Sequence, residues 1–258
     1  MTQIPSFDLE NFDKSFIGSS QDDYFYPSAS EAESFTYYVD GKEGDDTLYI
    51  DDSAGVVVLG GDGNDDIDAW DVTGPVQAFG GDGNDNIDIY SSNNSTMFAY
   101  GGNGNDTLKG GNKNDNLYGD SGNDKIFGNS GKDNLWGGSK NDKLDGGKGN
   151  DILYGQDGND KLKGGKGKDY LKGGAGKDIL TGGKGRDTFE LSAGKDIIKD
   201  FDLDGGEKIV IDGETFGDTP RINQQGDDVR IRGNAGMDAF VENVNLPEFL
   251  AADVIEII

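Results

Sequence analysis

The chain has 258 residues, and its 50 Asp and Glu against 23 Lys and Arg give a net charge of −27. This charge excludes a protein that binds duplex DNA by neutralising phosphates, and the absence of Cys and His excludes disulfides, thiolate or imidazole metal sites and Ser-His or Cys-His nucleophiles. Apolar runs of about four residues are far shorter than the roughly 20 residues of a membrane-spanning helix. We therefore expect no nucleic-acid partner and no membrane span.

Residues 1–40 are rich in aromatic side chains and hold nine of the 23 Phe and Tyr. They include a nine-residue segment, GSSQDDYFY from Gly18, in which Asp23 and Phe25 are in phase with the repeats described below. We expect these aromatic residues to close the first coil of a repeated structure. The alternative is that they dock on another copy of the chain, because an uncapped parallel solenoid is a template for head-to-tail growth.

Residues 41–100 contain three nonapeptides, GKEGDDTLY from Gly41, GGDGNDDID from Gly60 and GGDGNDNID from Gly80. Motif starts at 18, 41, 60, 80 and 101 lie about one full coil apart. The sequence therefore predicts glycine loops on one edge only, with irregular turns on the opposite edge at 51–55, 71–75 and 91–96. The expected returning strands are 56–59, 76–79 and 97–100.

Residues 101–190 divide without remainder into ten nonapeptides. In all thirteen regular copies, position 1 is Gly, position 6 is Asp, and position 8 is Leu, Ile or Phe. Glycines at positions 1, 2 and 4 permit a tight, curved loop lined with carbonyl oxygens that ends in one carboxylate. Positions 7 to 9, such as 107–109 and 161–163, read as a very short strand with one inward apolar residue. The copies are GGNGNDTLK, GGNKNDNLY, GDSGNDKIF, GNSGKDNLW, GGSKNDKLD, GGKGNDILY, GQDGNDKLK, GGKGKDYLK, GGAGKDILT and GGKGRDTFE.

The loops are suited to a hard cation. One buried Leu per strand cannot offset the entropy lost when nine residues become ordered, so burial alone does not fold such a stack. Oxygen-only loops that face one another suit Ca²⁺, which accepts six to eight oxygens in variable geometry. Loops 18 residues apart lie above one another, which predicts ions between Asp106 and Asp124, and between Asp151 and Asp169. The alternative is that Gly, Asn and Asp are present only as turn formers.

These nonapeptides resemble the RTX (repeats-in-toxin, hemolysin-type calcium-binding) motif GGxGxDxUx, without a gap over 101–190 and more loosely over 18–202. The resemblance implies an all-β fold, a serralysin-like parallel β-roll (a right-handed, β-helix-like solenoid) with terminal β-rich caps, and several bound Ca²⁺ ions. Lys113 and Lys140 replace the fourth-position Gly, which puts sites using Asp115 and Asp142 in question. The metal ligands that it implies are Asp46, Asp65, Asp85, Asp106, Asp115, Asp124, Asp133, Asp142, Asp151, Asp160, Asp169, Asp178 and Asp187, with the loop residues Gly61, Gly63, Gly81, Gly83, Gly102, Gly104, Gly147, Gly149, Gly165, Gly167, Gly174, Gly176, Gly183 and Gly185.

Charge is divided unevenly along the chain. The net charge is −19 for residues 1–109, +1 for 110–190 and −9 for 191–258. The Lys-rich middle stretch has two interpretations, a solvated strand face that offsets the aspartates, or a stripe that binds an acidic surface polysaccharide. Bound divalent ions would make this stretch positive.

Residues 191–258 fit a C-terminal cap, which a stacked solenoid needs to cover its last coil. The nonapeptide LSAGKDIIK from Leu191 keeps Gly194, Asp196 and Ile198 in phase, and the run GKDIIKDFDLDGGEKIVI resembles the segment that follows RTX repeats. The tail DVIEII, with Asp253 and Glu256 among aliphatic residues, resembles the C-terminal signal of substrates of type I secretion machinery. Its alternative is an ordinary capping strand. Four alternating segments predict strands at 196–201, 208–212, 228–232 and 239–244.

The expected organisation is an N-terminal cap (1–40, with the degenerate repeat at 18–26), one-sided coils (41–100), a regular nonapeptide β-roll (101–199) and a C-terminal cap with secretion signal (200–258). We expect an extracellular or cell-surface protein that folds on binding Ca²⁺, is exported without an N-terminal signal peptide, and self-assembles. An RTX-tailed enzyme is the competing hypothesis, although no HExxH or GxSxG motif occurs. A glycan-binding module is a third. Position 3 is never Thr, so an ice-binding lattice is not expected.

Overall fold

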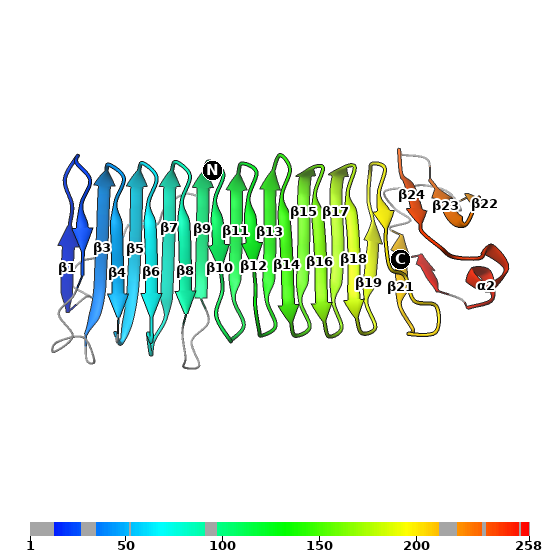
Figure 1. Cartoon of the computed structure of the whole chain (residues 1–258), viewed down its shortest axis with the longest axis horizontal. Coiled ribbons are helices and arrows are strands. Elements are labelled where there is room, and N and C mark those ends of the chain that lie inside the picture. The colour runs from blue at the N-terminus through cyan, green and yellow to red at the C-terminus, as the bar shows by residue number, and fades with distance from the viewer. Residues whose placement is uncertain are drawn as a thin grey trace. The chain divides into compact units, whose positions relative to one another are not determined.

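The computed structural model describes residues 13–26, 35–51, 53–90, 97–211, 221–233, 236–252 and 254–257. The chain forms two compact units, residues 1–134 and 135–258. Both units are all-β, and along the repeats of each unit consecutive strands belong to two different sheets and run in opposite directions, so that two strands make one coil (Figure 1). The predicted parallel β-roll is therefore confirmed. No helix in the described part of the chain has the length and apolar character needed to cross a membrane.

The first unit contains two parallel sheets. The first sheet has the order β1 (Lys14–Ile17), β3 (Thr36–Glu43), β5 (Gly55–Asp62), β7 (Val76–Asp82), β9 (Met97–Asn103) and β11 (Asn116–Ser121). The second has the order β2 (Tyr24–Phe25), β4 (Thr47–Asp51), β6 (Asp66–Trp70), β8 (Asn86–Tyr90), β10 (Thr107–Lys109) and β12 (Lys125–Phe127). The returning strands expected before Gly60, Gly80 and Gly101 are thus present as β5, β7 and β9. The expected turn at 91–96 lies outside the described residues.

The second unit continues the same pattern and ends in the cap. Its first sheet has the order β13 (Asn134–Ser139), β15 (Ile152–Gly158), β17 (Tyr170–Gly176), β19 (Thr188–Leu191), β21 (Lys208–Ile211) and β25 (Ile255–Ile257). Its second sheet has the order β14 (Lys143–Lys148), β16 (Lys161–Lys166), β18 (Ile179–Lys184), β20 (Ile197–Ile198), β24 (Asp238–Val241), β23 (Asp228–Arg232) and β22 (Arg221–Gln225). The last two pairings are antiparallel.

The core lies between the two sheets and differs in thickness along the chain. Each of the strands β4, β6 and β8 buries two inward apolar residues, as Leu48 and Ile50 do in β4. From β13 to β18 each strand buries a single leucine, such as Leu162 in β16. The alternation follows from the two-residue period of a strand, which sends every second side chain inward. One leucine per strand is the core that the nonapeptide predicts.

Strands of the second unit are longer than the predicted triplets. β14, β16 and β18 each span six residues, because positions 1 to 3 of the following nonapeptide continue the strand pairing. Gly147 pairs with Gly165, and Lys148 with Lys166. The expected strands of positions 7 to 9 alone are therefore too short here. The first three residues of each of these six-residue loops thus form the end of the preceding strand.

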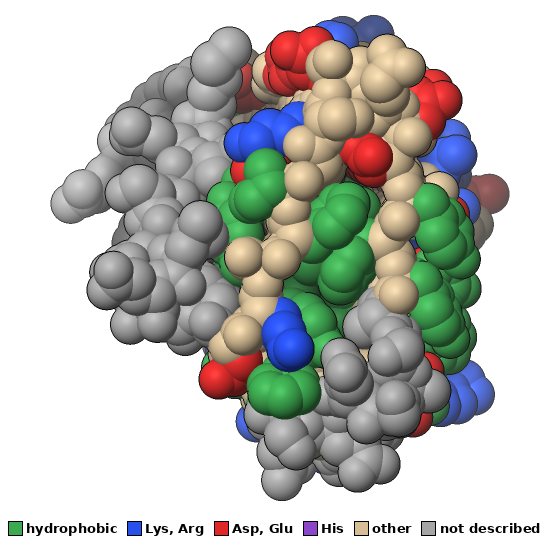
Figure 2. All heavy atoms as spheres, turned by 90° about the vertical axis from the view of Figure 1, so that its left-hand side faces the viewer, with side chains coloured by type: hydrophobic (Ala, Val, Ile, Leu, Met, Phe, Trp, Pro, Cys, Tyr) green, Lys and Arg blue, Asp and Glu red, His purple; other side chains and the backbone are tan. Residues whose placement is uncertain are grey.

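Aromatic side chains close the first coil. The ring centroids of Phe16 and Phe25 are 4.9 Å apart, and those of Phe25 and Tyr37 are 6.1 Å apart. Figure 2 shows hydrophobic side chains filling the space between the backbone of the two sheets at this end. Phe16, Phe25 and Tyr37 thus contact one another at the first coil, while Tyr24 and Tyr26 are exposed.

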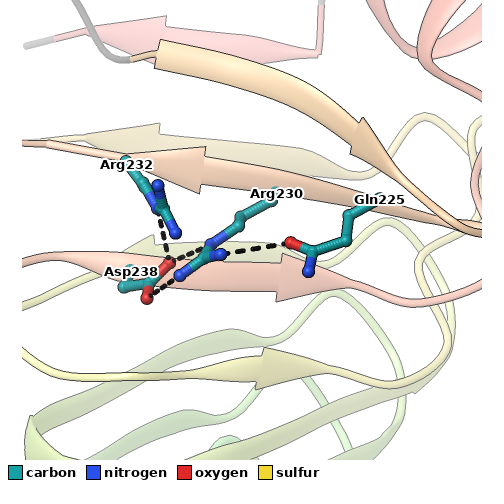
Figure 3. Close-up of polar contacts among 4 residues, drawn as sticks. All are labelled: Gln225, Arg230, Arg232 and Asp238. Atoms are coloured by element: carbon teal, nitrogen blue, oxygen red, sulfur yellow. Dashed lines mark hydrogen bonds and ion pairs between the residues drawn. The ribbon is translucent and has the colours of Figure 1, made fainter.

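The C-terminal cap ends the second sheet with an antiparallel hairpin. Arg230 in β23 donates from Nε and Nη2 to the two carboxylate oxygens of Asp238 in β24, at 2.6 and 2.5 Å, and from Nη1 to Gln225 Oε1 at 3.1 Å (Figure 3). This bidentate pair holds the pKa of Asp238 below its usual value. The cap also contains a short helix, α2 (Leu246–Ala251), which the sequence did not predict.

Candidate calcium-binding loops

Nonapeptide loops lie on two edges in each unit. Loops that lead from the first sheet to the second make edge 1, and loops that lead back make edge 2. In the first unit edge 1 holds loops 41–46, 60–65, 80–85, 101–106 and 119–124, and edge 2 holds loops 110–115 and 128–133. In the second unit edge 1 holds loops 137–142, 155–160, 173–178 and 191–196, and edge 2 holds loops 146–151, 164–169 and 182–187.

The sixth-position aspartates form hydrogen-bonded ladders along both edges. The N–H of Asp65 donates to Oδ1 of Asp85 at 2.8 Å, and the N–H of Asp85 donates to Oδ1 of Asp106 at 2.8 Å. On edge 2 of the second unit the N–H of Asp151 donates to Oδ1 of Asp169 at 2.9 Å. The structure thus brings together the aspartates that the 18-residue spacing predicted to be stacked. All thirteen are buried, at 0–3% exposure.

The second carboxylate oxygen of these aspartates points into a space lined by oxygens. A Cβ built on Gly60 would overlap both Asp65 Oδ2 and the Gly80 carbonyl oxygen, and one built on Gly164 would overlap Asp169 Oδ2 and approach the Gly182 carbonyl oxygen. Buried acceptors that converge without a donor fit a hard cation. The Oδ2 atoms that are buried and have no hydrogen-bond partner among the described residues include those of Asp46, Asp65, Asp85, Asp106, Asp160 and Asp169.

Burial changes the proton affinity of these carboxyls. It raises the pKa of Asp85 to about 8, and those of Asp106, Asp160 and Asp169 to about 7. Neighbouring carboxylates add to the effect, as Asp124 does for Asp106. A buried carboxylate is costly when charged, so it takes up a proton or needs a cation. A metal ion that binds to a ladder would therefore displace protons from its carboxyl groups.

Glycine at position 4 is required by the close approach of successive loops. Gly63 has a φ of 141°, and a Cβ on it would collide with the Gly44 carbonyl group of the preceding loop. This conformation and the tight contact together exclude other side chains. The glycines that the RTX resemblance names therefore shape the loop. Any ligation by them would come from their carbonyl oxygens.

The two lysine-substituted loops behave differently. Lys140 takes a φ of 80° in place of glycine, and a Cβ on Gly137 would still overlap Asp142 Oδ2, so loop 137–142 keeps its oxygen-lined space. In loop 110–115, by contrast, Gly111 donates its N–H to Oδ2 of Asp115 at 2.8 Å. The carboxylate of Asp115 is thereby already satisfied by the backbone, a contact absent from the regular loops described above.

Two further acidic residues close edge 2 of the second unit, and sequence reasoning did not select them. Asp200 accepts the N–H groups of Gly182 and Gly183 at 2.9 Å each, and Glu207, 1% exposed, accepts the N–H of Asp202 at 2.8 Å. Burial raises the pKa of Glu207 to about 8. The signal was the acidic run DFDLDGGE directly after the last repeat.

The degenerate copies also join the edge 1 ladders. Asp23 donates its N–H to Oδ1 of Asp46 at 2.7 Å, and Asp178 donates its N–H to Oδ1 of Asp196 at 3.3 Å. Within the described residues no three acidic side chains come together as a metal-binding group. Each regular loop contributes one buried carboxylate, so further ligands would be backbone carbonyl oxygens.

Comparison with known proteins identifies the repeats. The model of the RTX calcium-binding nonapeptide repeat (4 copies) matches residues 100–135, 127–162, 136–171, 154–189 and 163–198. The segment 100–198 belongs to the RTX repeat family. This segment of the β-roll therefore carries RTX calcium-binding repeats. No curated protein matches the chain.

Two solved structures are similar to the chain in part. One is the extracellular lipase LipA from Serratia marcescens, with 22% identity, a TM-score of 0.35, and coverage of 62% of this chain and 39% of the lipase. The other is the AlgE6R3 subunit from the Azotobacter vinelandii mannuronan C5-epimerase, with 27% identity, a TM-score of 0.22, and coverage of 48% of this chain and 77% of that subunit. The chain thus spans about two fifths of the lipase.

Proposed function

We propose that this protein is a non-enzymatic, extracellular structural protein whose folding is its response to calcium. The aspartate ladders carry this proposal. Each ladder gathers buried carboxylates whose Oδ1 atoms accept backbone N–H groups while Oδ2 atoms such as those of Asp65, Asp85 and Asp169 face carbonyl oxygens. Such an arrangement of acceptors is unfavourable when ionised unless a cation lies among them.

The proposed ligands are the sixth-position aspartates together with carbonyl oxygens of the glycine loops. Loops that keep the open Oδ2 geometry, such as 60–65 and 164–169, are the strongest sites. Loop 110–115 is the weakest, because the Asp115 carboxylate already has a backbone donor. A bound Ca²⁺ ion supplies the positive charge that makes the convergence of these oxygens favourable.

This arrangement suits a protein that is exported unfolded. Where free Ca²⁺ is scarce, the carboxylates of a ladder repel one another and a core of one leucine per strand gives too little stabilisation for folding. Extracellular Ca²⁺ sites have dissociation constants of about 10⁻⁴ to 10⁻³ M, so ions would bind outside the cell and drive folding. The tail strand β25 pairs with β21, with Glu256 opposite Val210, so it caps the sheet once folded. Asp253 of the expected export signal lies outside the described residues. We propose that type I secretion machinery reads this tail before the strand forms.

Circular dichroism tests the proposed function. The protein in EDTA should give a coil spectrum, and millimolar calcium should convert it to a β spectrum, while millimolar magnesium should do so less well because Mg²⁺ demands a stricter geometry. A β spectrum that is unchanged by chelation would overturn the proposal. Turnover of ester, peptide or polysaccharide substrates by the pure protein would overturn its non-enzymatic part.

A further inference from the structure

A column of lysines runs along edge 2 of the second unit. Lys148 pairs in register with Lys166, and Lys166 with Lys184, so these residues stand on neighbouring strands β14, β16 and β18. Backbone hydrogen bonds from Gly149 to Lys166 and from Gly167 to Lys184, each 2.8 Å long, fix the alignment. Adjacent strands are about 4.8 Å apart. Three exposed lysines thus stand in line on neighbouring strands.

This column consists of like charges opposite one another. Some other lysines are paired across strands with an acid, as Lys163 is with Asp145 at 2.9 Å and Lys109 with Asp88 at 2.6 Å. Among the described residues, no ion pair involves Lys148, Lys166 or Lys184. Like charges directly opposite one another in a sheet are destabilising. An external row of negative charges would therefore stabilise the lysine column.

Neighbouring groups increase the positive character of this edge. Lys168 and Arg186 occupy position 5 of the adjacent loops and are also exposed. The acidic groups beneath them, Asp169 and Asp187, are buried in the ladder that the proposed calcium ions would neutralise. Calcium-loaded, this edge presents five cations and no exposed acid within loops 146–151, 164–169 and 182–187. An exposed acid beside them is Asp200, which accepts hydrogen bonds from the N–H groups of Gly182 and Gly183.

The first unit carries the complementary surface. On edge 1, Glu43 pairs in register with Asp62, and Asp62 with Asp82, so three exposed carboxylates stand on β3, β5 and β7 with the same spacing. No ion pair among the described residues involves any of them. The acidic column occupies position 3 of its loops, and so does the lysine column. The two columns therefore match in number, spacing and strand position.

A groove beside the acidic column suits lysine side chains. It has a volume of about 250 Å³ and is lined by Asp62 and Asp82 together with the aromatic residues Phe79 and Tyr100 and with Asp120. The rings of Phe79 and Tyr100 are stacked with centroids 5.0 Å apart. A lysine lays its aliphatic stem on an aromatic surface while its ammonium group reaches a carboxylate. The groove offers both contacts to a row of lysines.

We propose that the lysine column of one copy docks on the acidic column and aromatic groove of a second copy. This proposal rests on the proposed calcium-folded state, because register across both columns exists only in the β-roll. The contact is heterologous, since one surface belongs to the first unit and the other to the second. The resulting dimer keeps one free lysine column and one free acidic column, so association continues beyond a dimer unless a ring closes. A linear polyanion is the competing occupant of the lysine column.

Two charge-reversal variants test the docking surface. K148E/K166E/K184E carries two acidic columns, and E43K/D62K/D82K carries two basic ones. In millimolar calcium, sedimentation velocity should show concentration-dependent association of the wild type and dissociation constants at least about tenfold higher for each variant alone. A one-to-one mixture of the variants should associate again, because each supplies the column that the other needs.

Controls separate this contact from general charge effects. K143E/K161E/K177E makes the same change in net charge at exposed lysines that lie outside the column, and it should associate as the wild type does. Raising the salt from about 50 to about 500 mM should dissociate the wild type, because the exposed charges are then screened. Undiminished association of K148E/K166E/K184E, or no recovery in the mixture, would overturn the proposal.

Remaining outcomes are also decisive. If the wild type folds in calcium but stays monomeric at all concentrations, the docking proposal is wrong and the proposed function stands. If calcium does not change the circular dichroism spectrum, the proposed function itself is wrong. Dextran sulfate is the probe for the polyanion. If it binds the monomeric wild type and not K148E/K166E/K184E, the lysine column is a polyanion site and the proposal is wrong.

Discussion

The coils of residues 36–100 and those of residues 135–191 share one backbone design and stabilise it differently. The first group buries two apolar residues in strands such as β4 and β8 and has glycine loops on edge 1 only. The second group buries one leucine per strand and has loops on both edges. Where apolar burial is smaller, the number of candidate ion sites is larger. The comparison indicates that ion binding and hydrophobic burial substitute for one another along this chain.

Calcium removal should give the largest difference between the two groups of coils. Hydrogen exchange of the full chain in EDTA should show complete loss of protection in peptides covering 143–187. Peptides covering 47–90 should keep more protection, because two inward side chains per strand remain buried without ions. Equal loss in both groups would contradict the proposed substitution of burial by ion binding.

Core substitutions sharpen the same comparison. Leu162→Ala leaves β16 without an inward apolar side chain, whereas Ile87→Ala leaves Ile89 in β8. In saturating calcium, we expect Leu162→Ala to lower the free energy of unfolding by about 5 kcal/mol. We expect Ile87→Ala to lower it by about 2 kcal/mol. Urea denaturation measures both. A larger effect of Ile87→Ala would show that core thickness does not control stability here.

Substitution of a ladder aspartate should also have a larger effect in the coils that bury one leucine per strand. Asp169→Asn keeps an acceptor for the N–H of Asp151 but removes the charge that the proposed cation needs. We expect it to raise the calcium concentration at the folding midpoint several-fold, and Asp65→Asn to raise it less, because its coils bury more apolar surface. Asp157→Asn, at an exposed loop position, is the matched control. A control that shifts the midpoint as much as Asp169→Asn would remove the assignment of the ladder as the binding site.

The pH dependence without calcium is the smallest expected effect. The pKa of Asp85 is raised to about 8 and that of Asp169 to about 7 in the folded chain, against 3.8 for an ordinary Asp. The folded state then binds more protons than the unfolded state between about pH 4 and pH 8, so the calcium-free fold loses stability as pH rises through this window. Circular dichroism in EDTA should show more β structure near pH 4 than at pH 8. The opposite trend would contradict the burial of these carboxyls.

The repeat sequence predicted the architecture and the stacking of the aspartates. A nine-residue period with Gly at position 1, Asp at position 6 and Leu at position 8 leaves few ways to place one turn and one strand per repeat. The 18-residue ladder from Asp106 to Asp124 and the degenerate ladder members Asp23 and Asp196 follow from that period. Local periodicity is enough here because each coil contacts only its neighbours.

Other features depended on the folded chain. Strand pairing extends through positions 1 to 3 of the loops, which places Lys148, Lys166 and Lys184 in one line; the nonapeptide pattern had assigned these positions to turns. Glu207 and helix α2 lie beyond the last repeat, where no period constrains the chain. The donor to the Asp115 carboxylate, the Gly111 N–H, was likewise set by loop geometry.

The physical reason for this division is the range of each interaction. Turn preference and the alternation of side chains act over a few residues and are written directly in the sequence. The surroundings of a carboxylate or an ammonium group depend on which neighbours the sheet register brings within a few ångströms. The sequence by itself determined the coil and its aspartates, and the tertiary structure decided which charges are buried, paired or aligned.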